Sequence, residues 1–134
     1  YWTIALIILL MLCTACRKNG PDDVRRTDVS RDELKEWQEQ KIDLSILDVR
    51  SRGEYESGHV PGAMNIDYKE IEARIDELEP FRKQKIVVYC RSGRRAAIAQ
   101  KALKKSGFED VYQLDGDMIG WNKAGLPVET TNTE

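Results

Sequence analysis

One segment in the second half of the chain constrains the fold more than any other. Residues 85–89 form an apolar, β-branched run that is typical of a buried strand, and this run continues directly into Cys90. A short glycine-containing loop follows, and residues 94–105 have an alanine-rich pattern that predicts a helix ending before Gly107. A strand, a tight loop and a helix in succession are typical of parallel α/β sheets, which bind ligands at the carboxyl ends of their strands.

The rest of the sequence also alternates between strand and helix patterns. Ser30 with Glu33 is a capping-box signal for the start of a helix. Apolar residues spaced i, i+4, i+7 predict an amphipathic helix over residues 68–79, which Pro80 ends. We therefore predict an α/β fold with a mainly parallel central sheet of about five strands and helices on both faces. Further strands are expected at residues 44–49, 64–66 and 111–114.

The beginning of the chain has a different character. An uncharged apolar run from Trp2 to Cys16 ends abruptly at Arg17. This run is shorter than the roughly 20 residues of a transmembrane helix and has the length of a signal-peptide apolar region. Since no basic segment precedes it, we expect the sequence to start inside a truncated leader.

The end of this run resembles a bacterial lipobox, with Thr14-Ala15 before Cys16. In such signals the cysteine becomes the lipidated first residue of the mature chain, so Cys16 is the expected lipidation site. A simple cleaved signal and an uncleaved anchor are the alternatives. The expected location is the periplasmic side of the bacterial cell envelope, with the domain lipid-anchored or, alternatively, soluble in the periplasm.

Length and charge limit the organisation of the rest. A chain of 134 residues suits one folded domain. The formal net charge of −2 gives no reason to expect nucleic acid as a partner, and membrane contact is expected only through the N-terminal lipid or leader. We expect a leader (1–16), a polar tether (17–26), one folded domain (27–128) and a disordered tail (129–134).

The three cysteines narrow the chemistry. Cys13 would leave with the leader and Cys16 would be acylated, which leaves Cys90 as the free thiol of the folded domain. An internal disulfide and a metal site built on several cysteines are then excluded, and we expect neither a metal nor another cofactor.

The loop that begins at Cys90 combines three effects that favour a thiolate over a thiol. Backbone amides of a tight loop can point inward, the following helix presents the positive end of its dipole, and three arginines lie within a few residues. Gly93 permits backbone angles that a loop around a sulfur atom needs. The alternative interpretation is a small, inert, buried cysteine beside arginines that only solvate a helix start.

With this loop, the chain resembles the rhodanese family, in its single-domain form, from about residue 27 to 128. Three segments carry the resemblance in the right order: the residues from Asp48-Val49-Arg50 to Ile66, with Gly58-His59-Val60-Pro61-Gly62 between them; the loop Cys90-Arg91-Ser92-Gly93-Arg94-Arg95; and Leu114-Asp115-Gly116 with Trp121, Gly125 and Pro127. A second glycine usually follows the position of Gly116, whereas Asp117 stands there in this chain. We expect this departure to affect a turn and not the chemistry.

The resemblance implies a sulfurtransferase. Cys90 would be the catalytic nucleophile, taking the outer sulfur of a small anionic donor such as thiosulfate and holding it as a persulfide. The sulfur would pass to cyanide or to a thiol, including a protein thiol. Arg91 and Arg94 would attract the donor, and the loop amides would stabilise the persulfide. The predicted substrate-binding residues are Arg91, Ser92, Gly93, Arg94 and Arg95.

Three further residues are expected to support the loop. Asp48 can hydrogen-bond the loop or a nearby arginine, and Arg50 is expected to form a structural ion pair with Glu54. His59 belongs by resemblance to a glycine-rich turn, where it would hold the loop by hydrogen bonds instead of taking part in catalysis.

Loop length distinguishes sulfur transfer from phosphate chemistry. Cysteine phosphatases, some of them built on this fold, place five residues between the cysteine and an arginine, whereas four residues separate Cys90 from Arg95 and Ala96 follows. A shorter loop suits a single sulfur atom, so a phosphatase or arsenate reductase ranks lower. The sequence also leaves open a non-catalytic binding module of the same fold and a redox or sulfur sensor.

Overall fold

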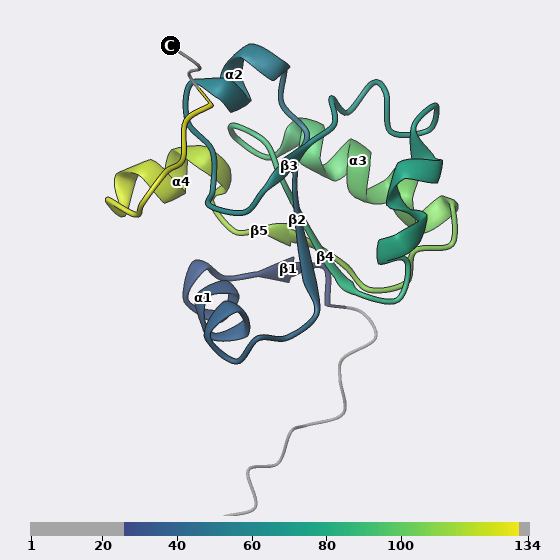
Figure 1. The fold of residues 1–134 in the computed structure, drawn as a ribbon, viewed down its shortest axis with the longest axis horizontal. Coiled ribbons are helices and arrows are strands. Elements are labelled where there is room, and N and C mark those ends of the chain that lie inside the picture. Colours follow the sequence, from purple (N-terminus) through teal and green to yellow (C-terminus); the bar gives the residue numbers. More distant parts are fainter. Residues whose placement is uncertain (1–25, 132–134) are drawn as a thin grey trace, which may run out of the picture.

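The computed structural model describes residues 26–131, and the predicted leader with its lipidation site at Cys16 lies outside them. All five strands of the central sheet run parallel, in the order β1-β5-β4-β2-β3 (Figure 1). The predicted fold class is confirmed. The strands are β1 (Asp28–Val29), β2 (Leu44–Asp48), β3 (Met64–Asn65), β4 (Lys85–Tyr89) and β5 (Val111–Leu114).

Helices cover both faces of the sheet. Figure 1 shows α1 and α4 on one side of the strands and α3 with the 3₁₀ helix η1 on the other. Within residues 26–131, no helix is long and apolar enough to cross a membrane. The helices are α1 (Arg31–Glu39), α2 (Arg52–Glu56), η1 (Ile75–Phe81), α3 (Arg94–Lys105) and α4 (Asp117–Lys123).

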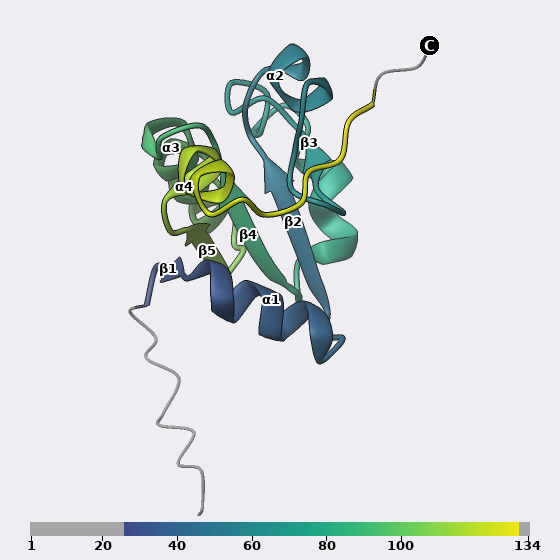
Figure 2. The same ribbon diagram turned by 90° about the vertical axis from the view of Figure 1, so that its left-hand side faces the viewer.

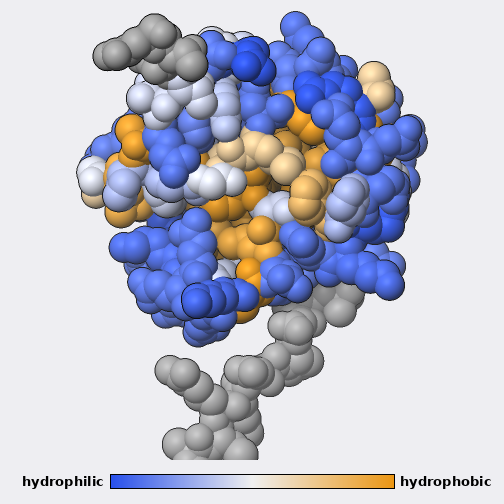
Figure 3. Space-filling model, in the orientation of Figure 1, coloured by the Kyte–Doolittle hydropathy of each residue, from blue (hydrophilic) through white to orange (hydrophobic). Residues whose placement is uncertain are grey.

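Alternation along β4 divides the core into two layers. Val88 packs with α3 and η1, whereas Val87 and Tyr89 pack with α1 and α4, and all three side chains are fully buried. Since both faces of a parallel sheet are covered, this strand is apolar on both sides. On the face drawn in Figure 3, hydrophilic residues surround an apolar region at its centre.

The helix predicted over residues 68–79 is wrong in type. Residues 68–74 form successive turns, and η1 continues through Pro80. Proline has no amide hydrogen for an α-helical hydrogen bond, which favours a shorter and tighter helix here. The expected buried face is nevertheless present, because Ile71 and Leu78 are each 1% exposed.

Two short elements are absent from the prediction made from the sequence, although Ser51 with Glu54 has the same capping-box spacing as Ser30 with Glu33. β1 has two residues and pairs with β5 at the edge of the sheet. α2 has five residues and is preceded by its N-cap residue Ser51. The Ser51 hydroxyl accepts from the amide of Glu54, while the Glu54 carboxylate accepts from the amide of Ser51. This reciprocal capping box stabilises a helix that is too short to show an apolar period.

The disorder predicted from residue 129 onwards is wrong for residues 129–131. The backbone groups of Glu129 and His59 exchange two hydrogen bonds of 2.9 Å, and the amide of Thr131 donates to the carbonyl of Glu56. Figure 2 shows the segment after α4 running across the strands toward α2. The polar side chains of this segment favour disorder, but its order comes from backbone groups that pair with a distant turn. Similarly, Arg26 at the end of the expected tether forms an ion pair with Glu33.

Candidate active site

The cysteine loop lies at the carboxyl end of the central strand. β4 is flanked by β5 and β2, and Tyr89 at its end is in register with Asp48 at the end of β2. Residues 90–93 then turn into α3, whose amino end points into the loop. This is the strand–loop–helix arrangement expected from the sequence. It places the loop where parallel sheets bind ligands, beside the positive end of a helix dipole.

The loop curls around the sulfur atom. The amide of Gly93 donates a hydrogen bond to Cys90 Sγ at 3.0 Å. Among residues 26–131, the amides of Arg91 and Ser92 find no acceptor, so they are free to bind an anion held in the loop. Gly93 has φ +116°, and a Cβ atom there would lie 2.8 Å from Nε2 of Gln113. Because L side chains rarely adopt this backbone conformation, the loop favours glycine at this position.

Burial distinguishes the cysteine from the residues after it. Cys90 is 1% exposed, whereas Arg91, Ser92 and Arg94 are exposed to solvent. The sulfur is enclosed by the loop, with the amide nitrogen of Gly93 3.0 Å away. A merely structural cysteine would be buried as well, but it would not need an amide hydrogen bond to sulfur from a left-handed glycine.

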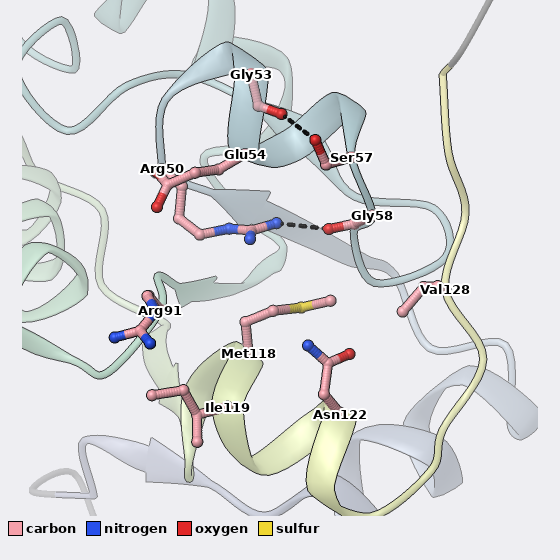
Figure 4. A pocket seen from close by; sticks show the side chains of 10 residues that line it. All are labelled: Arg50, Gly53, Glu54, Ser57, Gly58, Arg91, Met118, Ile119, Asn122 and Val128. Atoms are coloured by element: carbon pink, nitrogen blue, oxygen red, sulfur yellow. Dashed lines mark hydrogen bonds between the residues drawn. The ribbon is translucent and has the colours of Figure 1, made fainter.

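An open cleft of about 690 Å³ adjoins the loop (Figure 4). The amide of Met118 donates to the carbonyl of Cys90 at 2.9 Å, and the amide of Ile119 donates to that of Arg91 at 3.1 Å. These bonds fasten the α4 wall of the cleft to the cysteine loop. The lining comes from α2 and its flanks, the loop, α4 and the C-terminal segment: Arg50, Gly53, Glu54, Ser57, Gly58, Arg91, Met118, Ile119, Asn122 and Val128.

A buried polar network supports the strand ends. Arg50 pairs with Asp48 at 2.7 Å and also donates to the carbonyl of Gly58 at 2.8 Å. The Tyr89 hydroxyl donates to Asp48 at 2.7 Å and accepts from the amide of Val60. Burial, together with the Asp48 carboxylate, raises the pKa of Tyr89. The network joins the ends of β2 and β4 to the glycine-rich turn.

The prediction of an ion pair between Arg50 and Glu54 is wrong. Glu54 instead accepts two hydrogen bonds from Arg95, at 2.8 and 3.1 Å. The hydrogen bond from Arg95 lowers the pKa of Glu54 to about 2. The structure thus places the Arg95 guanidinium on a carboxylate of α2, where it braces α3 against α2. Arg50 has a different partner because Asp48, two residues away, offers it a fully buried carboxylate.

His59 lies in the turn before β3, and its contacts are with the turn and the tail. Its Nδ1 is 2.8 Å from the carbonyl oxygen of Tyr55, and its ring stacks on the Tyr55 ring with centroids 3.7 Å apart. Its Nε2 is 3.6 Å from the carboxylate of Glu129. At 2% exposure, the imidazole is placed to hold the turn and the C-terminal segment together.

Asp117 has a larger role at the site than the sequence indicates. This residue is 3% exposed, and its Oδ1 accepts a hydrogen bond from the amide of Cys90 at 2.9 Å. Its Oδ2 accepts from Gln113 at 3.3 Å. Burial raises the pKa of the Asp117 carboxyl, against the lowering effect of its hydrogen bonds to Cys90 and Gln113. The signal in the sequence is the acidic residue after Gly116, at a position where the resemblance suggests glycine.

The fold and the loop together define a class of protein. A parallel five-stranded sheet carries, at the end of its central strand, a cysteine whose sulfur is enclosed by a short loop at a helix N-terminus. The model of the rhodanese-like domain family matches residues 30–124, and the chain belongs to this family.

Curated relatives are similar to part of this chain. The chain is 41% identical over 86 residues to the putative sulfur carrier protein YrkF of Bacillus subtilis, covering 61% of this chain and 45% of that one. It spans 34–45% of the length of the first three curated relatives that it matches.

Two solved structures have a fold similar to that of this chain. One is the Alr3790 protein from Anabaena, with a TM-score of 0.70 and 31% identity, over 78% of this chain and 83% of that one. The other is a thiosulfate sulfurtransferase from Pseudomonas aeruginosa, with a TM-score of 0.71 and 26% identity, over 81% of this chain and 21% of that one.

Proposed function

We propose that this domain is a sulfurtransferase that carries sulfane sulfur on Cys90. The observation that carries the proposal is the hydrogen bond from the amide of Gly93 to Cys90 Sγ, inside a loop with two further free amides among the described residues. Such a loop stabilises a sulfur anion, whether thiolate or persulfide. The names of two similar proteins, a putative sulfur carrier and a thiosulfate sulfurtransferase, support the same reaction.

The reaction has two balanced steps. The Cys90 thiolate attacks the outer sulfur of thiosulfate, the S–S bond of the donor breaks, and sulfite leaves with the electron pair. The persulfide keeps one negative charge. We expect the amide of Gly93, which donates to Sγ, to stabilise this charge together with the amides of Arg91 and Ser92, which have no acceptor among the described residues. Cyanide or a thiolate then attacks the outer sulfur, and Cys90 leaves as a thiolate, ready for the next donor.

The surroundings of the loop suit an anionic donor and a larger acceptor. Arg91 lines the cleft, and Arg94 is exposed at the start of α3, so both can attract a doubly charged donor. A cleft of about 690 Å³ is far larger than thiosulfate needs. It leaves room for a thiol that is carried on a protein. Phosphate chemistry is less well supported, because Glu54 holds Arg95.

Intact-mass measurement tests the proposal directly. The full chain is incubated with thiosulfate, separated from excess donor and weighed. We expect a gain of one sulfur atom that is absent in Cys90→Ser and is lost when cyanide is added. The absence of any adduct with thiosulfate or other sulfane donors would favour a binding module.

We also propose that the domain acts on the periplasmic side of the bacterial cell envelope, anchored by a lipid on Cys16. The support is the apolar run and the lipobox-like residues before Cys16. In the native cell, Cys16→Ser should move the protein from the membrane fraction to the soluble fraction. A wild-type protein found in the cytoplasm would contradict this location.

A further inference from the structure

Asp117 connects the cysteine loop to the first turn of α4. Its Oδ1 accepts from the amide of Cys90 at 2.9 Å, while the amide of its neighbour Met118 donates to the carbonyl of Cys90, also at 2.9 Å. Both peptide groups of Cys90 are therefore held by α4. Asp117 itself has φ +50°, a conformation in which aspartate and asparagine are the most frequent residues after glycine.

The same carboxyl group reaches the other end of the loop. Its Oδ2 accepts from Gln113, and Gln113 also donates to the carbonyl of Gly93 at 3.1 Å. A Cβ on Gly93 would lie 3.1 Å from Oδ2 of Asp117. One buried side chain thus contacts Cys90 directly and lies against Gly93, the residue whose amide donates to the sulfur.

The carboxyl group is also a charge beside the sulfur. Covalent geometry keeps Oδ1 within about 7 Å of Cys90 Sγ, because Oδ1 is hydrogen-bonded to the amide of the same residue. Among residues 26–131, no lysine or arginine forms an ion pair with Asp117. A nearby carboxylate without a paired cation disfavours a second anion at the sulfur.

We propose that Asp117 is a positioning residue for the sulfur transfer proposed above, holding the Cys90 amide and making sulfur loading dependent on pH through its negative charge. Because the carboxylate and the thiolate repel each other, ionised Asp117 favours the neutral thiol. Loading then needs a higher pH than it would in the same loop with glycine at this position. The inference rests on the proposed function and adds a side chain that controls the loading of sulfur on Cys90.

Other charges near this pair contribute less, because they are exposed or already paired. Asp115 is exposed in the turn before α4, and Arg31 donates to its carbonyl oxygen. The surrounding charged groups are Asp28 on β1, Arg31 on α1, Asp115 before α4, and Arg91, Arg94 and the Glu54-paired Arg95 around the loop.

Two variants separate the charge from the hydrogen bond. Asp117→Asn keeps an oxygen that can accept from the Cys90 amide but removes the charge, and its side-chain NH₂ cannot accept the hydrogen bond from Gln113. Asp117→Gly removes both. Asparagine and glycine both tolerate the left-handed backbone at this position, so neither variant introduces strain there. Asp115→Asn is the matched control, since it removes a charge from an exposed carboxylate two residues away.

The titration is followed by the ¹³Cβ chemical shift of labelled cysteine in the full chain, with the Cys90 signal assigned by its loss in Cys90→Ser. We expect the midpoint of thiolate formation to move to lower pH in both Asp117 variants and to change little in Asp115→Asn. Above these midpoints, sulfur loading from thiosulfate should stay within roughly twofold of wild type in Asp117→Asn and fall about tenfold in Asp117→Gly.

The two roles of Asp117 can be refuted separately. An unchanged midpoint in Asp117→Asn overturns the role of the charge. Equal loading rates for Asp117→Asn and Asp117→Gly at high pH overturn the positioning role. Because the titration uses no sulfur donor, a wild-type protein that titrates normally but never loads sulfur would refute the proposed function without deciding against the effect of Asp117 on Cys90.

Discussion

Replacing Glu54 by glutamine removes the charge that holds Arg95 and leaves a side chain that can still serve the N-terminus of α2. The pKa of Glu54 falls from 4.5 to about 2, chiefly through the hydrogen bond from Arg95. A shift of this size in a shielded pair corresponds to about 3 kcal/mol. Since 33% of the Glu54 side chain is exposed, solvent screening reduces the loss of folding free energy to about 1–2 kcal/mol.

The pH dependence identifies the cause of this loss. A carboxyl group whose pKa is lower in the folded state contributes stability above its unfolded pKa, and this contribution disappears as the pH falls from about 4.5 to about 2. The difference between wild type and Glu54→Gln should therefore be full at pH 7 and fall by more than half by pH 3.

Urea denaturation of both proteins at several pH values measures this difference. Glu56→Gln is the control, because Glu56 pairs with Arg52 at an exposed site and should contribute less than about 0.5 kcal/mol. If the effect of Glu54→Gln were the same at pH 3 as at pH 7, the charge of Glu54 would not be the source of the brace between α2 and α3.

Three other substitutions test the site. Gly93→Ala should abolish sulfur loading in the intact-mass assay and lower the free energy of unfolding by about 1–3 kcal/mol, because φ is +116° and the added Cβ meets Gln113; normal loading would contradict the loop geometry. Arg91→Ala with Arg94→Ala should raise the apparent KM for thiosulfate, more strongly at low salt, and an unchanged KM would show that these side chains do not attract the donor. Tyr89→Phe should lower the free energy of unfolding, measured by urea denaturation, by about 1–3 kcal/mol, because it removes the donor to buried Asp48; an unchanged free energy would show that this hydrogen bond does not stabilise the fold.

The parts of the site that the sequence predicts are those that neighbouring residues build. The strand, Cys90, Gly93 and the helix that follows are contiguous, so the run of residue types is enough to place a sulfur atom at a strand end. The same holds for the N-terminus of α1, where Ser30 accepts from the amide of Glu33 at 3.1 Å. Local hydrogen bonds of this kind depend on sequence spacing alone.

The parts that the sequence does not predict depend on distant partners. Arg95 meets Glu54 from 41 residues away, and Cys90 meets Asp117 from 27 residues away. Several carboxylates compete for each arginine, and only the packing of the helices decides between them. The apolar spacing over residues 68–79 is ambiguous for another reason, since successive turns and a 3₁₀ helix can bury the same residues as an α-helix.

The strand order has a consequence for how the chain acquires its fold. β1 near the beginning pairs with β5 near the end, so that Val29 lies beside Leu114. As a ribosome releases the chain from its N-terminus, β2 and β4 can pair early, whereas β1 waits for almost the whole domain to be synthesised. Contacts between such distant segments make folding slow. A nascent chain that stops before β5 would leave its first strand without a partner.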